Sequence, residues 1–318
     1  MICYFAPMEG VTDVIYRRVH HRHFGGVSKY FMPFISPSHS LTFNARERFD
    51  MSPAQNASVP VVPQILTNNP DYFNAVALML RDMGYQEVNL NLGCPSGTVT
   101  AKGKGAGLLR APDQLKALLD GIFAAPTLPI SIKTRIGYDS AEAWPRLLAL
   151  YAQYPVHELI VHPRTRQEFY EGTPHPEACT AIKGPFIYNG NLFTAEACQA
   201  LLQSRPQAAG VMLGRGLVAN PALAQTVDSG APLTLEALTA FHDDLYYEYS
   251  RFWPQTAVVG RMHLMMKYLC SCFENSDGPR RALRRATTED AYFAAVRQLF
   301  RACPLKQEPA FELSILLS

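Results

Sequence analysis

The sequence predicts a (β/α)₈ barrel followed by a small, all-helical C-terminal domain. Short β-rich runs alternate with helix-compatible segments over about 230 residues, which is typical of this barrel. Several runs are almost continuously apolar, as in a parallel sheet covered on both faces. After residue 232 the strands stop and only helical periodicity remains. We therefore expect a barrel over residues 1–232 and a helical domain over residues 233–318.

The expected strands are bounded by loop-forming residues, and the expected helices between them are amphipathic. The eight strands are Ile2–Ala6, Lys29–Phe31, Pro60–Gln64, Glu87–Asn91, Ile130–Lys133, Glu158–His162, Phe186–Asn189 and Gly210–Leu213. Clear helical segments are Tyr72–Met83, Asp113–Phe123 and Ala195–Leu202. In the C-terminal domain, Leu238, Phe241, Leu245 and Tyr249 recur at helical spacing, and the break at Asn275–Pro279 predicts at least two helices.

Composition restricts the class of protein. Hydrophobic residues make up 48% of the 318 residues and charged residues 18%, which favours a large core over disorder. No run reaches the roughly 18 apolar residues that cross a bilayer, and the first ten residues lack a secretion-signal pattern. We expect a cytoplasmic protein. The net charge of +2 does not by itself predict a nucleic-acid partner.

Cysteine spacing predicts neither a disulfide framework nor a metal site, because the seven cysteines are scattered and no C-x-x-C pair occurs. Cys94 differs from the others because it follows a barrel strand, between Gly93 and Pro95. A lone cysteine is usually a packing residue, but this position suits packing poorly. Its thiol could serve as nucleophile or general acid, and the lack of an evident paired base favours proton donation.

Polar side chains stand at the carboxyl ends of the expected strands, where barrels carry their chemistry. They are Gln64, Asn91, Cys94, Lys133, His162 and Asn189. We expect them to converge on one mouth of the barrel. For Lys133 a salt bridge, for example with Glu9, is an alternative to a role in that site.

Glycines after the last two strands predict a phosphate site. Asn189-Gly190-Asn191 follows the seventh strand and Gly214-Arg215-Gly216 the eighth. Backbone N–H groups can approach an anion closely there, and a following helix adds its positive end. Lys133 and Gln64 would then lie beside a planar ring attached to that phosphate, such as a flavin, whose reduced anionic form a cation stabilises.

Seven blocks in order along the barrel resemble the signature motifs of the tRNA-dihydrouridine synthases. The blocks are APMEGVTD, PQIL, NLNLGCPSGTVTAKGKGAGLL, IKTRIG, VHPRTRQEFYEG, YNGN and MLGRG. The resemblance implies FMN as cofactor, NADPH (or NADH) as reductant, and reduction of uridines in tRNA to 5,6-dihydrouridine. It implies hydride transfer from the flavin to C6 of the base and proton donation from Cys94 to C5.

The resemblance also assigns roles by position. Pro7, Met8 and Glu9 should line the flavin, Gln64, Lys133 and His162 should contact it, and Asn189, Gly190, Asn191, Gly214 and Arg215 should hold its phosphate end. Asn91 should hold the uracil. Two positions depart from the family pattern: Pro163 stands where Gly is frequent, and Asn191 where an acidic residue is frequent.

A tRNA partner requires basic or stacking residues near the mouth. Candidates on the mouth loops are Arg135, Arg164, Arg166 and Tyr170, although a surface salt bridge is an equal alternative for each arginine. In the helical domain, Arg261 and Lys267 resemble a tRNA-contacting segment, and Arg280, Arg281, Arg284 and Arg285 form a basic cluster. From Leu233 onward ten Lys/Arg balance ten Asp/Glu, so the charges must be segregated by face.

Two other functions are open at this stage. One is an FMN barrel reductase of a small pyrimidine or enone, similar to dihydroorotate dehydrogenase, which would leave the C-terminal domain unexplained. The other is a non-catalytic RNA-binding protein on a degenerate barrel, which the presence of Cys94, Lys133 and His162 disfavours. We expect a monomer, and the sequence does not indicate which uridine is modified.

Overall fold

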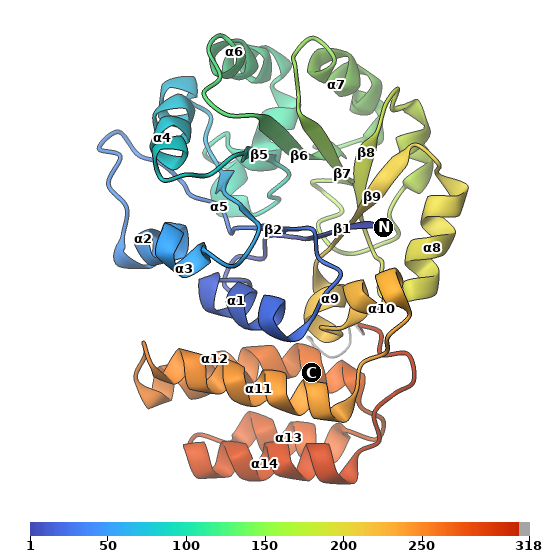
Figure 1. The fold of residues 1–318 in the computed structure, drawn as a ribbon. Helices are drawn as coiled ribbons and strands as arrows, with labels where there is room; N and C mark the ends of the chain where they lie inside the picture. Colours follow the sequence, from blue (N-terminus) through green and yellow to red (C-terminus); the bar gives the residue numbers. More distant parts are fainter. Residues whose placement is uncertain (312–318) are drawn as a thin grey trace.

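The computed structural model describes residues 1–311 and confirms a parallel α/β barrel followed by helices (Figure 1). The strands form one sheet in the order β3-β2-β1-β9-β8-β7-β6-β5-β4. Their bounds are β1 Ile2–Phe5, β2 Lys29–Phe31, β3 Val61–Val62, β4 Gln64–Ile65, β5 Val88–Leu92, β6 Ile130–Gly137, β7 Glu158–Thr165, β8 Phe186–Asn189 and β9 Ala208–Leu213. Every strand pairing in this sheet is parallel.

The barrel closes at Pro63. The third expected strand is broken there into β3, which pairs with β2, and β4, which pairs with β5. Proline has no N–H to donate to a ladder, but the Pro63 carbonyl still accepts the Asn89 N–H at 2.9 Å. The two ends of the sheet are therefore consecutive pieces of one strand.

Strands β6 and β7 are longer than expected, since they continue to Gly137 and Thr165. Their register shifts between Arg135 and Gly137, where β7 carries one residue more than β6. Pro163 lies in this segment of β7, where its missing N–H suits an irregular ladder. The extension places residues expected on mouth loops inside the barrel wall.

The barrel interior has an apolar and a polar side. Alternate strand residues form a small inner cluster: Tyr4, Ala6, Phe31, Val62, Ile160, Ile187 and Met212. On the side of β4, β5 and β6 the interior is polar, and Gln64, Asn89 and Ser131 are fully buried there. The larger apolar core lies between the sheet and the surrounding helices.

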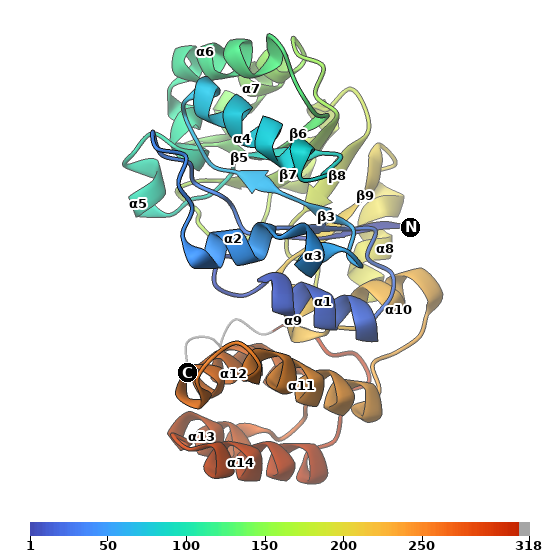
Figure 2. The same ribbon diagram turned by 60° about the vertical axis from the view of Figure 1, so that its left-hand side comes forward.

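Helices surround the barrel and continue beneath it (Figures 1 and 2). Around the barrel lie α1 Val14–His23, α2 Ala45–Met51, α3 Pro53–Asn56, α4 Pro70–Asp82, α5 Gly97–Thr100, α6 Pro112–Phe123, α7 Trp144–Tyr151, α8 Ala195–Ser204, α9 Arg215–Ala219 and α10 Leu223–Ser229, with 3₁₀ turns η1 Gly105–Arg110, η2 Ala141–Ala143 and η3 Pro176–Ala181. Below lie α11 Leu235–Ser250, α12 Gln255–Leu269, η4 Cys270–Cys272, α13 Asp277–Arg285 and α14 Glu289–Ala302. The helical part thus begins at α11, and its independence as a domain stays a prediction.

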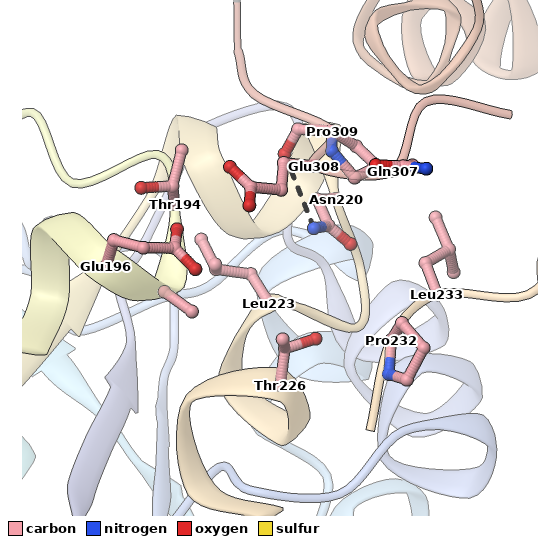
Figure 3. A pocket seen from close by; sticks show the side chains of 11 residues that line it. Thr194, Glu196, Asn220, Leu223, Thr226, Pro232, Leu233, Gln307, Glu308 and Pro309 are labelled. Carbon is pink, nitrogen blue, oxygen red and sulfur yellow. Dashed lines mark hydrogen bonds between the residues drawn. The ribbon is translucent and has the colours of Figure 1, made fainter. Parts of the chain in front are cut away.

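Residues 307–309 return from the helical part to the barrel. The Pro309 carbonyl accepts a hydrogen bond from Asn220 Nδ2 at 3.4 Å, next to Thr194 and Glu196 at the start of α8 (Figure 3). The cavity enclosed there measures about 30 Å³, and a single water needs roughly 10–15 Å³. This cavity is therefore too small for a cofactor or substrate.

No helix within residues 1–311 is long and apolar enough to cross a membrane.

Candidate functional site

Cys94 lies half-buried in the loop after β5, and Asn91 holds this loop in place. The Asn91 Oδ1 atom accepts the backbone N–H groups of Gly93 at 3.0 Å and Cys94 at 2.9 Å. The Cys94 carbonyl accepts the Ala106 N–H at 3.1 Å, which folds the glycine-rich segment back over the loop. A side chain at Gly105 would be strained, because its φ is +56° and its Cβ would lie 3.0 Å from the Cys94 carbonyl oxygen.

The Cys94 thiol is electrostatically suited to remain protonated. Burial raises its pKa above the ordinary thiol value, although the Ser96 N–H and the nearby Arg135 and Lys133 oppose this shift. A protonated thiol can donate a proton to a carbanion, whereas a thiolate would act as a nucleophile.

Lys133 and Gln64 lie on neighbouring strands on either side of Asn91. Gln64 Oε1 accepts a hydrogen bond from Asn91 Nδ2 at 2.7 Å. Lys133 forms no ion pair or hydrogen bond with any residue between 1 and 311, and Glu9, its alternative partner, pairs instead with Arg46 at 3.1 Å. Burial, followed by repulsion from Arg135, lowers the pKa of Lys133 to about 7. An uncompensated amine of this kind favours an anionic neighbour.

His162 is held as a neutral imidazole. Arg164 Nη1 lies 3.1 Å from His162 Nε2, and since a guanidinium only donates, Nε2 must accept and the ring proton must reside on Nδ1. Burial and the cations around it, Arg135 first among them, lower the pKa of His162 well below its usual value. The ring therefore offers an N–H donor without adding positive charge.

The predicted phosphate end brings together residues from β8, β9 and α9. Asn191 Oδ1 accepts hydrogen bonds from Arg215 Nη2 at 2.9 Å and Arg164 Nη1 at 3.2 Å. Asn189 Nδ2 donates to the Met212 carbonyl at 2.8 Å and ties the two strands together. Asn191, which stands where the family pattern has an acidic residue, is thus a neutral acceptor between two guanidinium groups. Their positive charge therefore stays available for an anion.

Gly190 has no room for a side chain, whereas Gly214 does. An added Cβ at Gly190 would lie 2.6 Å from the Tyr188 ring, a distance that real Cβ contacts do not reach. Gly214 is the residue before α9, and an added Cβ there would meet Ala6 at 3.5 Å and the Met8 sulfur at 3.7 Å. The backbone at Gly214 therefore borders the segment that follows β1.

Pro7, Met8 and Glu9 form the turn between β1 and α1. The Met8 carbonyl accepts the N–H groups of Val11 and Thr12 at 2.9 and 3.0 Å, which closes the turn. Pro7 and Met8 are half-buried, while Glu9 is exposed. Met8 thus lies beside Gly214, and contact of this turn with a flavin stays a prediction.

Arg135 and Arg164 are buried rather than displayed on loops, which differs from the expectation. Arg135 donates to the carbonyls of Gly93 at 3.0 Å and Thr165 at 2.7 Å, and Arg164 Nε donates to the Glu171 carbonyl at 3.1 Å. The extension of β6 and β7 into the mouth explains this burial. Their guanidinium groups shape the mouth and its positive potential from within.

Tyr170 lies over the centre of the mouth. Its ring stacks on His162 with centroids 6.3 Å apart, and the guanidinium carbons of Arg135 and Arg215 lie 5.2 and 5.4 Å from its centroid. Tyr170 remains 43% exposed, so one part of the ring is available for stacking. Arg166 lies beside it on the rim, with its guanidinium 5.4 Å from the Tyr138 ring.

Arg261 occupies the interface between α12 and the barrel, not an RNA-facing surface. It pairs with Asp13, the N-cap of α1, and donates to the Gly10 carbonyl and to the Tyr249 hydroxyl. Its side chain is 13% exposed. The expected tRNA contact is replaced by a structural one, because a partner 248 positions away in sequence satisfies the guanidinium. Lys267, on the same helix, is exposed.

The structure adds residues that the sequence reasoning missed. Glu87, Asn89 and Ser131 form buried hydrogen bonds beneath Gln64 and Asn91. The alternation Val-Asn-Leu-Asn-Leu in β5 is the signal that could have revealed them, since residues two apart share a face of a strand.

Known proteins of one family are similar to this chain over most of its length. The family model described as "Dihydrouridine synthase (Dus)" matches residues 4–302. A "Probable tRNA-dihydrouridine synthase" of Rhodobacter capsulatus is 30% identical over 309 residues, which cover 93% of each protein. "tRNA-dihydrouridine synthase B" of Pasteurella multocida is 29% identical over 231 residues, covering 71% of this chain and 68% of that protein.

Solved structures with a similar fold have low sequence identity to this chain. A variant of NCR from Zymomonas mobilis has a TM-score of 0.53 at 14% identity, covering 76% of this chain and 90% of that one. "Morphinone reductase" has a TM-score of 0.52 at 14% identity, covering 76% and 88%. These likenesses show the fold alone. The family match over nearly the whole chain, together with the relative that is 30% identical over 93% of it, shows that this chain belongs to the dihydrouridine synthase (Dus) family.

Proposed function

We propose that this enzyme reduces uridines in tRNA to 5,6-dihydrouridine with FMN as cofactor and NADPH (or NADH) as reductant, and that Cys94 donates the proton. Family membership supports the substrate class. The observation that carries the proposal is the Cys94 thiol, which burial keeps protonated beside Asn91 at the carboxyl end of β5. We further propose that the protein acts in the cytoplasm as a single chain.

The residues at the mouth fit FMN. Lys133 provides an amine without a partner among residues 1–311, Arg215 and Arg164 provide guanidinium groups, and Gly214 is half-buried at the start of α9. These groups favour an anion at both ends of a planar ligand. When bound, the flavin supplies the hydride chemistry. Lys133, Gln64 and His162 would hold its ring, and Asn189, Gly190, Asn191, Gly214 and Arg215 would hold its phosphate end.

Cys94 would protonate C5 of the uracil after a hydride has reached C6. Asn91 contributes twice, because its oxygen orients the Cys94 backbone and its amide keeps one N–H besides the one donated to Gln64. The raised pKa leaves the thiol in its donating form at neutral pH. General acid catalysis of this kind contributes about 10²- to 10⁴-fold to a rate.

The target base has to leave its stack to reach such a mouth, and unpaired tRNA loops make this less costly. Tyr170 offers a partly exposed ring for stacking, and Arg166 and Lys267 offer positive charge on the rim and on α12. The guanidinium groups of Arg135 and Arg164 already donate to backbone carbonyls. These two arginines would therefore act on the nucleotide through their positive electrostatic potential inside the mouth.

A deletion strain tests the proposal. Site-by-site mapping of dihydrouridine in its tRNA should show at least one position that loses the modification and regains it when the gene is restored. Unchanged dihydrouridine at every position, in a strain without a second family member, would contradict the proposal. Reduction of a small pyrimidine or enone by the purified flavoprotein would then identify it as a small-molecule reductase, whereas a colourless protein that does not take up FMN would indicate a non-catalytic RNA-binding protein.

A further inference from the structure

The polar side of the barrel interior contains a continuous line of hydrogen bonds that begins at Cys94. The Cys94 N–H donates to Asn91 Oδ1 at 2.9 Å, and Asn91 Nδ2 donates to Gln64 Oε1 at 2.7 Å. Gln64 Nε2 then donates to Asn89 Oδ1 at 2.7 Å. These residues alternate between β5 and β4, and each is at least nine-tenths buried apart from the half-buried Cys94.

The line continues to the opposite end of the barrel. Asn89 Nδ2 donates to Ser131 Oγ at 2.9 Å, and Ser131 Oγ donates to Glu87 Oε1 at 2.6 Å. The second carboxylate oxygen of Glu87 forms an ion pair with Lys29 at 2.6 Å. We call the set Asn91, Gln64, Asn89, Ser131 and Glu87 the amide relay.

Both ends of the amide relay fix the same direction of donation. At the mouth, the backbone N–H groups of Gly93 and Cys94 can only donate, so the atom of Asn91 that faces them must be its oxygen. At the other end, a carboxylate paired with Lys29 can only accept, so Ser131 must donate to Glu87. The orientation of the three amides between these ends therefore follows from the chemistry of the two end groups.

This direction determines what the mouth offers to a ligand. Asn91 and Gln64 each retain a second amide N–H, while the oxygen of Asn91 already accepts two backbone donors. His162 offers Nδ1–H because its other nitrogen accepts from Arg164. Together with the Lys133 amine and the Cys94 thiol, they give the mouth five side-chain donors, while Asn189, whose amide N–H goes to the Met212 carbonyl, keeps an acceptor oxygen.

We propose that Glu87, Ser131 and Asn89 are positioning residues that hold Gln64 and Asn91 with their free N–H groups toward the mouth, and that the Asn91 N–H selects a base edge that carries a carbonyl oxygen. This inference rests on the proposed function and deepens it. Uracil presents two carbonyl acceptors, whereas cytosine presents an amine in place of one of them, and a donor facing that amine would be left unpaired.

A double-mutant cycle tests the direction of the amide relay. In Asn91→Asp the new carboxylate can accept from Cys94 but cannot donate to Gln64, which favours the reversed direction along the relay. In Glu87→Gln the new amide places its oxygen toward Lys29 and its N–H toward Ser131, which also favours the reversed direction. In each single variant, one end of the relay therefore requires the original direction of donation and the other end requires the reversed direction. In the double variant, every hydrogen bond of the relay can form in the reversed direction.

The expected result is strong positive coupling between two positions four residues apart, about 13 Å along an extended strand. Each single variant should lower the melting temperature of the purified holoenzyme, and the double variant should melt well above the value that the sum of the two decreases predicts. Separated sites without shared partners normally give additive effects. Additive melting temperatures would overturn the relay.

Glu158→Gln provides the matched control. Glu158 also lies near Lys29, at 3.7 Å, and accepts from the Tyr4 hydroxyl, but it makes no bond to the amide relay. Combined with Asn91→Asp, it should give an additive decrease. If Glu158→Gln coupled to Asn91→Asp as strongly as Glu87→Gln does, the coupling would come from the charge around Lys29. That result would overturn the relay. These experiments measure melting temperatures, so their outcome does not depend on whether the protein reduces tRNA.

Turnover tests the role of the donors. Asn91→Asp keeps the shape of the side chain and its bond to Cys94, yet it should reduce uridine more slowly than Asn91→Ala, because an acceptor then faces the carbonyl edge. The reverse order would contradict the donor set. Ser131→Ala should lower single-turnover uridine reduction about five- to tenfold with FMN content unchanged. Thr134→Val, which removes a buried hydroxyl on the helix-facing side of the same strand, should not. Equal effects of these two variants would overturn the positioning role.

Discussion

Arg164 and His162, two residues apart on β7, are joined by a contact of 3.1 Å between Nη1 and Nε2. Because Arg164 also donates to Asn191, one guanidinium connects the imidazole to the predicted phosphate end of the site. The mouth therefore carries several cations while its histidine remains neutral. This combination places positive charge where an anionic cofactor would bind and a neutral N–H donor beside it.

The neutral state of His162 predicts a loss of stability in acid. Its pKa lies well below the usual value of about 6.5 in the folded protein, so below that pH the unfolded chain binds a proton that the folded chain does not. Stability attributable to His162 is thus lost as the pH falls from about 6.5 towards the folded pKa, by up to about 1.4 kcal/mol per pH unit. Urea unfolding between pH 7 and 5 should show a shallower pH dependence for His162→Gln than for the wild type. An equal change in a variant of the exposed His39 would contradict a site-specific cause.

Lys133 predicts uptake of a proton when FMN binds. Its pKa of about 7 in the flavin-free protein should rise when an anion approaches its amine, so at pH 8 binding should draw a proton from solution. Calorimetric titrations in two buffers of different ionisation enthalpy measure this uptake directly. Lys133→Met should bind FMN more weakly and without that proton. An uptake that persists in Lys133→Met would show that another group is responsible.

Arg261 and Lys267, on the same helix, predict opposite effects of substitution. Arg261→Ala leaves Asp13 without its partner at the domain interface and should lower the free energy of unfolding by about 3 kcal/mol. Lys267→Ala should change stability by less than about 0.5 kcal/mol but weaken tRNA binding and reduce its salt dependence by about one counterion. Denaturant unfolding and tRNA titration at several salt concentrations check both. A stable Arg261→Ala protein with normal melting would contradict the interface role.

The sequence was sufficient for the barrel, because periodicity and strand order predict a closed set of parallel strands. Asn189 ends β8 as predicted, whereas Lys133 and His162 lie inside β6 and β7, which continue beyond the predicted ends. The split at Pro63 also has a local cause, although it was not anticipated. Proline interrupts the third strand where the barrel closes.

What could not be predicted depends on partners distant in sequence. Arg135 and Arg164 were expected on loops, but β6 and β7 extend past them, and backbone carbonyls of other segments satisfy their guanidinium groups. The burial of Arg261 depends on Asp13, near the opposite end of the chain. A basic residue in a motif looks the same in sequence whether it faces RNA or closes an interface.

The most direct test of the account compares Cys94→Ala with the wild type in separate half-reactions. Both proteins should bind FMN and accept electrons from NADPH at similar rates. When each reduced enzyme is then mixed with tRNA lacking dihydrouridine, flavin reoxidation and dihydrouridine formation should be about 10²- to 10⁴-fold slower in Cys94→Ala. Reoxidation at the wild-type rate, with dihydrouridine formed at the same position, would contradict the assignment of Cys94 as the proton donor.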